Sequence, residues 1–127
     1  MLEINKADIL TALEDSKDSL ISTHKRLCLP LIIRMYKKME NGIKFDAIKV
    51  SESTIVDGHH RYVASVLAGQ NLPTIKSATT SATIEYDWKD VEFVEEDWDT
   101  PEIIQKMNEA DAEYNNMTLD QINEMIK

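Results

Sequence analysis

The sequence is poor in several residue types, and each shortage argues against a class of protein. Its 127 residues include a single cysteine, Cys28, so no disulfide can form within the chain, and a reducing compartment is favoured. Three glycines and three prolines are too few for a low-complexity or collagen-like chain. No apolar run approaches the length needed to span a bilayer.

The N-terminal segment also lacks the apolar run of a secretion signal, because residues 1–8 carry charges at three positions. We therefore expect a cytoplasmic protein with no membrane segment. With 43% hydrophobic and 29% charged residues, the chain is typical of one globular domain over residues 1–127.

Basic residues are scarce in the second part of the chain. Residues 77–127 contain fourteen acids and three lysines, whereas residues 1–76 are nearly balanced, and the net charge is −9. Direct binding to DNA is not expected, because phosphate contacts depend on Lys and Arg. A strongly acidic region could attract a basic partner, or it could serve solubility alone.

The hydrophobic pattern and the turn residues predict an α/β (α+β) domain with several helices around a small mixed sheet. We expect its core at about 30–95, N-terminal helices within 5–28 and acidic C-terminal helices within 100–127. The expected helices are 6–13, a second stretch ending near 26, 30–39, 61–67, and two that begin at 101 and 119. The expected strands are 47–50, 54–56, 72–75, 82–86 and 91–94.

One segment carries chemistry beyond this framework. A β-branched run, Thr54-Ile55-Val56, ends in Asp57-Gly58, and a helical pattern begins at once. A strand that turns directly into a helix leaves backbone N–H groups free at the positive end of the helix, where anions bind. His59, His60 and Arg61 add side-chain donors, and arginine can bind phosphate through two parallel hydrogen bonds.

Structural alternatives exist for the same residues. Asp57-Gly58 could form a hairpin turn, and Arg61 could pair with a carboxylate such as Asp57. Adjacent histidines could bind a metal, but they point in different directions on a helix, and the third histidine, His24, is distant in sequence. We expect no metal site. Cys28 lies between two leucines and reads as a core residue.

The stretch from Ile32 to Ser77 resembles the ParB/sulfiredoxin superfamily (ParB N-terminal domain-like). The resemblance rests on the order of a helix ending in Met39-Glu40-Asn41-Gly42, a strand at Ala47–Val50, the segment Ile55–Ser65, and then Leu67-Ala68-Gly69. It covers about a third of the chain and implies the fold more strongly than an activity.

Family members differ in the loop at this position, and the differences assign roles. Partition ParB proteins carry Gly-Glu-Arg-Arg, which contacts the phosphates of CTP. Sulfiredoxins carry Gly-Cys-His-Arg and bind ATP. Free-serine kinases of this fold carry Asp-Gly-His-Thr-Arg. Gly58 and Arg61 match all three patterns, His60 matches the sulfiredoxin histidine, and Asp57 and His59 match the kinase pattern. Because the sulfiredoxin cysteine would fall at His59, sulfiredoxin chemistry is not expected.

The resemblance therefore implies a nucleotide (ATP or CTP, with Mg²⁺) or another small phosphate ligand. Gly58, His59, His60 and Arg61 would bind it. A phosphotransferase or nucleotide hydrolase would draw its catalytic groups from Asp57, His59 and His60, with Glu40 a distant second as the acid.

A second hypothesis is a protein-binding role for residues 85–99. This segment alternates aromatic residues, including Trp88 and Trp98, with acids. Tryptophan is a common interface anchor, and acids speed the encounter with a basic partner. An immunity protein or antitoxin that neutralises a basic nuclease toxin would have this composition. Alternatively, both rings cover the core while the acids face water.

Overall fold

The computed structural model describes residues 4–16 and 19–127 and has the expected mixed α+β architecture. The elements follow one another as α1 (Lys6–Asp15), β1 (Arg26–Cys28), α2 (Leu29–Glu40), β2 (Ile48–Ser51), β3 (Thr54–Asp57), α3 (His59–Ala68), β4 (Thr74–Lys76), the 3₁₀ turn η1 (Trp88–Asp90), β5 (Glu92–Val94), α4 (Pro101–Tyr114) and α5 (Leu119–Met125).

Two small sheets frame the molecule. The first has the order β3-β2-β4, with β2 antiparallel to β3 and parallel to β4, so it is a mixed sheet. The second is the parallel pair β1-β5, in which Leu27 lies opposite Phe93 and both side chains are buried. Parallel pairing requires a crossover connection, and the whole first sheet, together with α2 and α3, lies between β1 and β5 in sequence.

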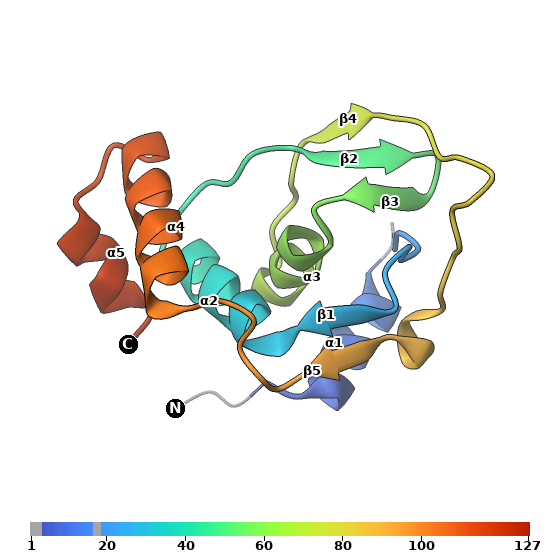
Figure 1. Ribbon diagram of the computed structural model, residues 1–127, viewed down its shortest axis with the longest axis horizontal. Coiled ribbons are helices and arrows are strands. Elements are labelled where there is room, and N and C mark those ends of the chain that lie inside the picture. Colours follow the sequence, from blue (N-terminus) through green and yellow to red (C-terminus); the bar gives the residue numbers. More distant parts are fainter. Residues whose placement is uncertain (1–3, 17–18) are drawn as a thin grey trace.

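Helix α3 lies at the centre, between the three-stranded sheet and the β1-β5 pair (Figure 1). Tyr62, Val63 and Ala64 from α3 are buried and belong to the main hydrophobic core. Helix α2 packs against α3 and adds Ile32 and Met39, while α1 contributes Ile9 and Leu13 to the same core. The other elements therefore pack around α3 on several sides and fix the position of its N-terminus.

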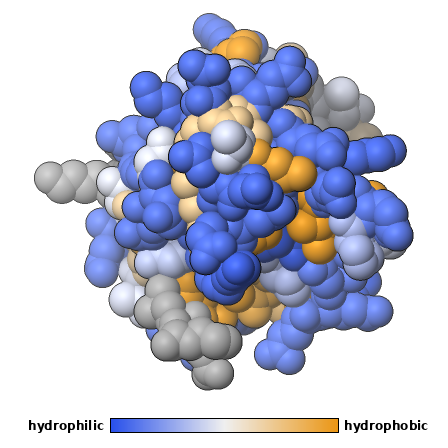
Figure 2. Space-filling view, turned by 90° about the vertical axis from the view of Figure 1, so that its left-hand side faces the viewer, coloured by the Kyte–Doolittle hydropathy of each residue, from blue (hydrophilic) through white to orange (hydrophobic). Residues whose placement is uncertain are grey.

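Helices α4 and α5 form a separate end of the molecule with a small core of their own, made by Ile43, Ala112 and Ile122. The buried Lys38 of α2 joins this end to the rest through a 2.6 Å ion pair with Asp111. Viewed from this side, the surface is mostly hydrophilic, with apolar patches showing between the polar side chains (Figure 2).

The helix boundaries confirm the capping signals in the sequence. Asn5 and Asp8 form a capping box at α1, and Thr118 and Gln121 form another at α5. Thr100 caps α4 through the N–H of Ile103. Each of these caps satisfies backbone donors that would otherwise lack partners in the first turn.

The second N-terminal helix, expected to end near residue 26, is wrong over its described part. Residues 17 and 18 lie outside the described residues, and the chain from residue 19 to β1 contains no helix. Ile21 pairs with Thr54, and Ser22 pairs with Tyr86. The segment is held by hydrogen bonds to residues distant in sequence, which override its weak helical pattern.

The strand expected at 82–86 is also wrong, except for the single bridge at Tyr86. Thr80 and Thr83 exchange backbone and side-chain hydrogen bonds in a local turn, and Ile84 is exposed. Threonine side chains that bond nearby backbone compete with a strand ladder. Across residues 4–16 and 19–127, no helix is both long and apolar enough to cross a membrane.

The turn between β3 and α3 depends on glycine for two separate reasons. Gly58 has a φ of +96°, and a Cβ there would lie 2.6 Å from Ile48 Cγ2. Gly69, after α3, has a φ of +67° but open space around the corresponding position. Gly58→Ala should therefore lower the free energy of unfolding by at least about 1 kcal/mol more than Gly69→Ala, which adds only backbone strain. Urea unfolding of the two variants measures the difference, and equal losses would contradict the close packing at Gly58.

Candidate functional site

The expected strand-to-helix turn is present, and it is not a hairpin. Strand β3 ends at Asp57, Gly58 takes the left-handed conformation, and α3 begins at His59. Gly58 has no side chain to cap the helix, and the first helical hydrogen bond runs from Tyr62 N to Gly58 O at 2.9 Å. The local sequence thus places a bare helix start directly after a strand.

The backbone N–H groups of His59, His60 and Arg61 are the donors at this helix start. No hydrogen bond to an acceptor in residues 4–16 or 19–127 uses any of the three. The N-terminus of a ten-residue helix carries a partial positive charge of about half a unit, carried by such N–H groups. The turn therefore presents three donors and a favourable field to an anion.

The guanidinium of Arg61 lies beside this turn. A Cβ on Gly58 would be 2.8 Å from Arg61 Nη2, because the side chain points back toward the helix N-terminus. The chain has two other arginines, and both have acid partners: Arg26 with Glu92, and Arg34 with aspartates of the 97–99 segment. Within the described residues Arg61 forms no ion pair or hydrogen bond, so the alternative of a structural pair with Asp57 is not found.

His59 is turned into the protein rather than toward a ligand. Its side chain is 1% exposed, and its Nε2 accepts a hydrogen bond from the N–H of Thr23 at 3.0 Å. Since Nε2 offers a lone pair, the ring proton lies on Nδ1, which is buried and has no partner in the described chain. His24 stacks on the outer side of the ring, with centroids 3.9 Å apart.

His60 makes an equivalent contact with the end of β1. Its Nε2 accepts a hydrogen bond from the N–H of Cys28 at 2.9 Å, at the junction of β1 and α2. The ring also meets Trp98 edge to face, with centroids 5.8 Å apart. Both histidines therefore anchor neighbouring backbone to the start of α3.

Burial fixes the protonation of these two side chains. It lowers the pKa of His59 to about 3, with smaller contributions from His24 and His60. It lowers the pKa of His60 to about 4, with a further contribution from His24. Both rings are neutral at pH 7, and neither adds positive charge to an anion site.

The acids proposed from sequence occupy separate places. Asp57 is exposed at the end of β3, opposite Lys49 in the register, and is the carboxylate closest in sequence to the turn. Glu40 is the last residue of α2, where it neighbours Tyr36; burial first and Glu40 second raise the pKa of that tyrosine. Asp57 therefore lies at the turn, whereas Glu40 lies beside Tyr36 on α2.

A cavity of about 360 Å³ lies beside β3, where Val56 and His24 line it, and none of residues 57–61 is part of its lining. Hydroxyl groups dominate its polar lining, and the residues that supply them are Thr23, Thr79, Thr80, Thr83 and Tyr86. Within the described residues no group of three or more His, Cys, Asp or Glu side chains could hold a metal ion. A cavity of this size can take part of a small ligand.

The two tryptophans of the acidic segment 85–99 differ in burial. Trp88 is buried, and its Nε1 donates to Leu20 O at 2.7 Å, whereas Trp98 is 48% exposed. Asp97 and Asp99 turn toward Arg34, and the hydrogen bond from Arg34 is the main reason that the pKa of Asp97 is lowered. The acids therefore do not all form one solvated face.

Several contacts at the site carry no signal in the sequence. The bonds from Thr23 and Cys28 to the two histidines join residues more than thirty positions apart. Cys28 Sγ also accepts from Trp98 N at 3.5 Å and donates to Glu96 O at 3.7 Å. No spacing rule links these positions, so only the folded chain shows that the helix start and the 94–99 segment are connected.

Comparison of the chain with protein-family models, curated proteins and solved structures finds no match. The resemblance to the ParB/sulfiredoxin superfamily stays a prediction from sequence.

The lowered pKa values of His59 and His60 should make the protein sensitive to acid. Their folded-state pKa values lie below the unfolded value of about 6.5, so below pH 6.5 the unfolded chain binds protons that the folded chain does not. Stability should therefore be fully present above pH 6.5 and fall as the pH drops toward 4. Between pH 7 and pH 5 each histidine should account for about 2 kcal/mol of lost unfolding free energy.

Urea unfolding of His60→Gln at both pH values tests this, because glutamine can accept the Cys28 N–H but does not titrate. The variant should lose about 2 kcal/mol less than the unmodified protein between pH 7 and pH 5. His24→Gln, at an exposed ring, is the matched control. An equal pH-dependent loss in His60→Gln and the unmodified protein would show that His60 is not held neutral by the fold.

Proposed function

We propose that the turn at Gly58 and the start of α3 bind the phosphate group of a small ligand. The observation that carries the proposal is the guanidinium of Arg61, which lies beside Gly58 with no carboxylate partner in the described chain. Three backbone N–H groups without acceptors lie in the same turn. A phosphate oxygen can accept from backbone N–H groups and from a guanidinium at once.

A nucleotide such as ATP or CTP is the ligand class that we favour. The resemblance to the ParB/sulfiredoxin superfamily suggests it, and the hydroxyl-lined cavity beside β3 could take its sugar or base. Asp57, exposed at the same turn, fits the single carboxylate that commonly holds Mg²⁺ together with phosphate oxygens. Asp57 is also the residue that would act as base if phosphoryl transfer follows binding.

In this proposal the histidines support the site and do not react. Their Nε2 atoms already accept backbone hydrogen bonds, and their depressed pKa values keep them uncharged at neutral pH. The roles predicted from sequence for His59 and His60, as ligand donors or catalytic groups, are therefore replaced by positioning of the helix start. Binding is better supported than catalysis.

Calorimetric titration with inorganic phosphate, and with ADP, ATP and CTP plus Mg²⁺, tests the proposal. At least one should bind, and Arg61→Ala should weaken that binding by about 10- to 100-fold, the effect of losing a charge-assisted hydrogen bond. Arg26→Ala is the control, because Arg26 is an exposed arginine paired with Glu92 on another strand, and its removal should change affinity less than twofold.

The proposal fails if none of the four compounds binds, or if Arg61→Ala and Arg26→Ala have the same effect. Circular dichroism of both variants separates a lost ligand contact from a lost fold.

A second candidate function, binding of a basic protein, is favoured by one observation, the exposed ring of Trp98. The loop that carries it is braced by the bond from Trp98 N to Cys28 Sγ and by the two aspartates on Arg34. Glu95 and Glu96 beside it are exposed. A rigid, exposed tryptophan flanked by acids has the character of an interface anchor for an immunity or antitoxin protein against a basic toxin.

Capture of partners from the cell that makes the protein tests this second candidate. Trp98→Ala should weaken capture of one basic partner by about 30-fold or more, the loss expected for an anchor residue, and the association rate should fall as salt rises. Tyr114→Ala, at an exposed aromatic ring on α4, should leave capture unchanged. Recovery of the same proteins with Trp98→Ala would rule out Trp98 as the anchor.

A further inference from the structure

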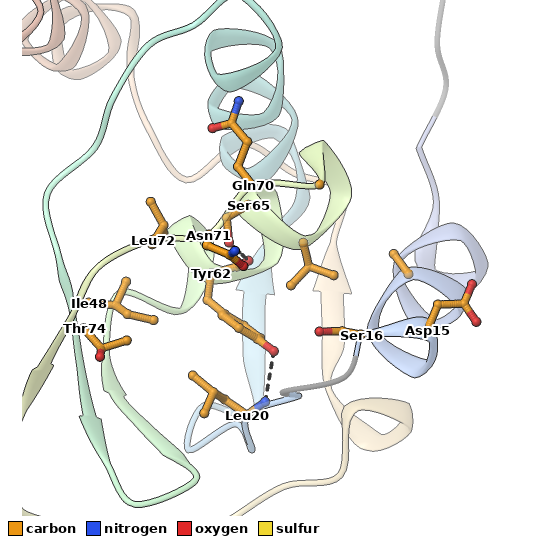
Figure 3. Close-up of a pocket in the computed structure, with 13 residues that line it drawn as sticks. Asp15, Ser16, Leu20, Ile48, Tyr62, Ser65, Gln70, Asn71, Leu72 and Thr74 are labelled. Carbon is orange, nitrogen blue, oxygen red and sulfur yellow. Dashed lines mark hydrogen bonds between the residues drawn. The ribbon is translucent and has the colours of Figure 1, made fainter.

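A second and larger cleft, of about 730 Å³, opens along α3 toward its C-terminal end (Figure 3). Side chains from α1, α3, β2 and β4 line it. Its size is in the range of small-molecule sites.

Two helices end at this cleft. Helix α1 contributes Ala12 and Asp15 from its last turn, and α3 contributes Ser65, Val66 and the Gly69 that follows it. A helix C-terminus carries a partial negative charge, and neither helix has a basic residue in its last turn to offset it. The ends of two ten-residue helices thus make the same space electronegative.

The charged side chains that line the cleft also make it negative. Asp15 stands at the α1 rim of the cleft, and no described lining residue is a lysine, arginine or histidine. Among the described lining residues an anion would meet only like charge, whereas a cation would gain from the carboxylate and from both helix ends.

The remaining lining offers hydrogen-bond acceptors beside apolar surface. Tyr62 Oη accepts a hydrogen bond from Leu20 N at 2.9 Å and has a second lone pair free to accept another. Ser65 Oγ donates its proton to Tyr62 O, so both of its lone pairs are free to accept. Asn71 makes no side-chain hydrogen bond within the described residues. Figure 3 shows Leu20, Ile48 and Leu72 beside these groups, and the aromatic face of Tyr62 can itself attract a cation.

We infer that this cleft binds an organic ammonium ion, a primary amine attached to an apolar or aromatic body. The ammonium donates to Ser65 Oγ and Asn71 Oδ1 near the end of α3, and the body lies against the apolar wall and the ring of Tyr62. The site uses the negative end of α3, whereas the proposed phosphate site uses its positive end. The two sites are independent, and either can fail without the other.

Three compounds that share a phenyl body and differ in charge provide the test: 2-phenylethylammonium, 2-phenylethanol and 3-phenylpropanoate. Titrations followed by amide chemical shifts should show the ammonium binding about tenfold more tightly than the alcohol, and the carboxylate more weakly than the alcohol. The shifted amides should include those of Tyr62, Ser65 and Asn71.

Two variants and two controls separate the cleft from general effects. Asp15→Asn should reduce the preference for ammonium over alcohol by two- to fivefold, the range for an exposed charge pair, whereas Glu102→Gln on α4 should not change it. Val66→Phe should block all three compounds by filling the cleft, with Leu72→Phe as a second filling variant if the first does not fold. Arg61→Ala should leave the ammonium preference intact.

Equal binding of the three compounds, or the reverse order, would overturn the inference, as would absence of binding by the ammonium. If the preference for ammonium over alcohol is unchanged in Asp15→Asn and also persists in the variants that fill the cleft, the ammonium binds elsewhere. That result would also overturn the inference.

Discussion

Two imidazole nitrogens that accept backbone N–H groups hold the centre of this protein together. The start of α3 reaches the extended segment 19–28 through His59 and Thr23, and the β1–α2 junction through His60 and Cys28. Each bond satisfies a backbone N–H group that is not hydrogen-bonded within a sheet or helix. Because His59 is buried and His60 is half-buried, each bond forms in a medium where it is stronger than in water and where its loss leaves a donor without a partner.

The rest of the site follows from this constraint. With both histidine side chains directed inward, the outward face of the turn consists of Gly58, three backbone N–H groups and the guanidinium of Arg61. The residue that anchors His60 also braces the acidic loop, since Cys28 Sγ bonds to the backbone of Glu96 and Trp98. The helix start, β1 and the loop that exposes Trp98 therefore form one connected unit. Nδ1 of His59 has no partner among the described residues, and this is a cost of the arrangement in the range of about 1–3 kcal/mol for a buried donor.

Much of this fold could be predicted from local sequence. Capping residues such as Asn5, Thr100 and Thr118 give the helix starts, and the break from β-branched residues to Asp57-Gly58 gives the strand-to-helix turn. Segment 19–28 could not be assigned, because its backbone bonds go to Ser53, Tyr86 and His59 rather than to nearby residues.

The site could be predicted in position but not in detail. Glycine and arginine at these spacings predict the strand-to-helix turn and its free N–H groups through backbone geometry, which is local, and the anion remains a proposal. The direction of His59 and His60 depends on which strand lies beside α3, a tertiary property. Their hydrogen bonding to Thr23 and Cys28, rather than to solvent or a ligand, is therefore visible only in the folded chain.

The most direct test of this account is the protonation state of the two histidines, read from the imidazole ¹⁵N chemical shifts between pH 8 and pH 5. The account predicts that His59 and His60 stay neutral throughout this range with the proton on Nδ1. Titration of either ring near pH 6.5, or a proton on its Nε2, would show that the backbone of Thr23 or Cys28 is not held there, and the account of the helix start would be wrong.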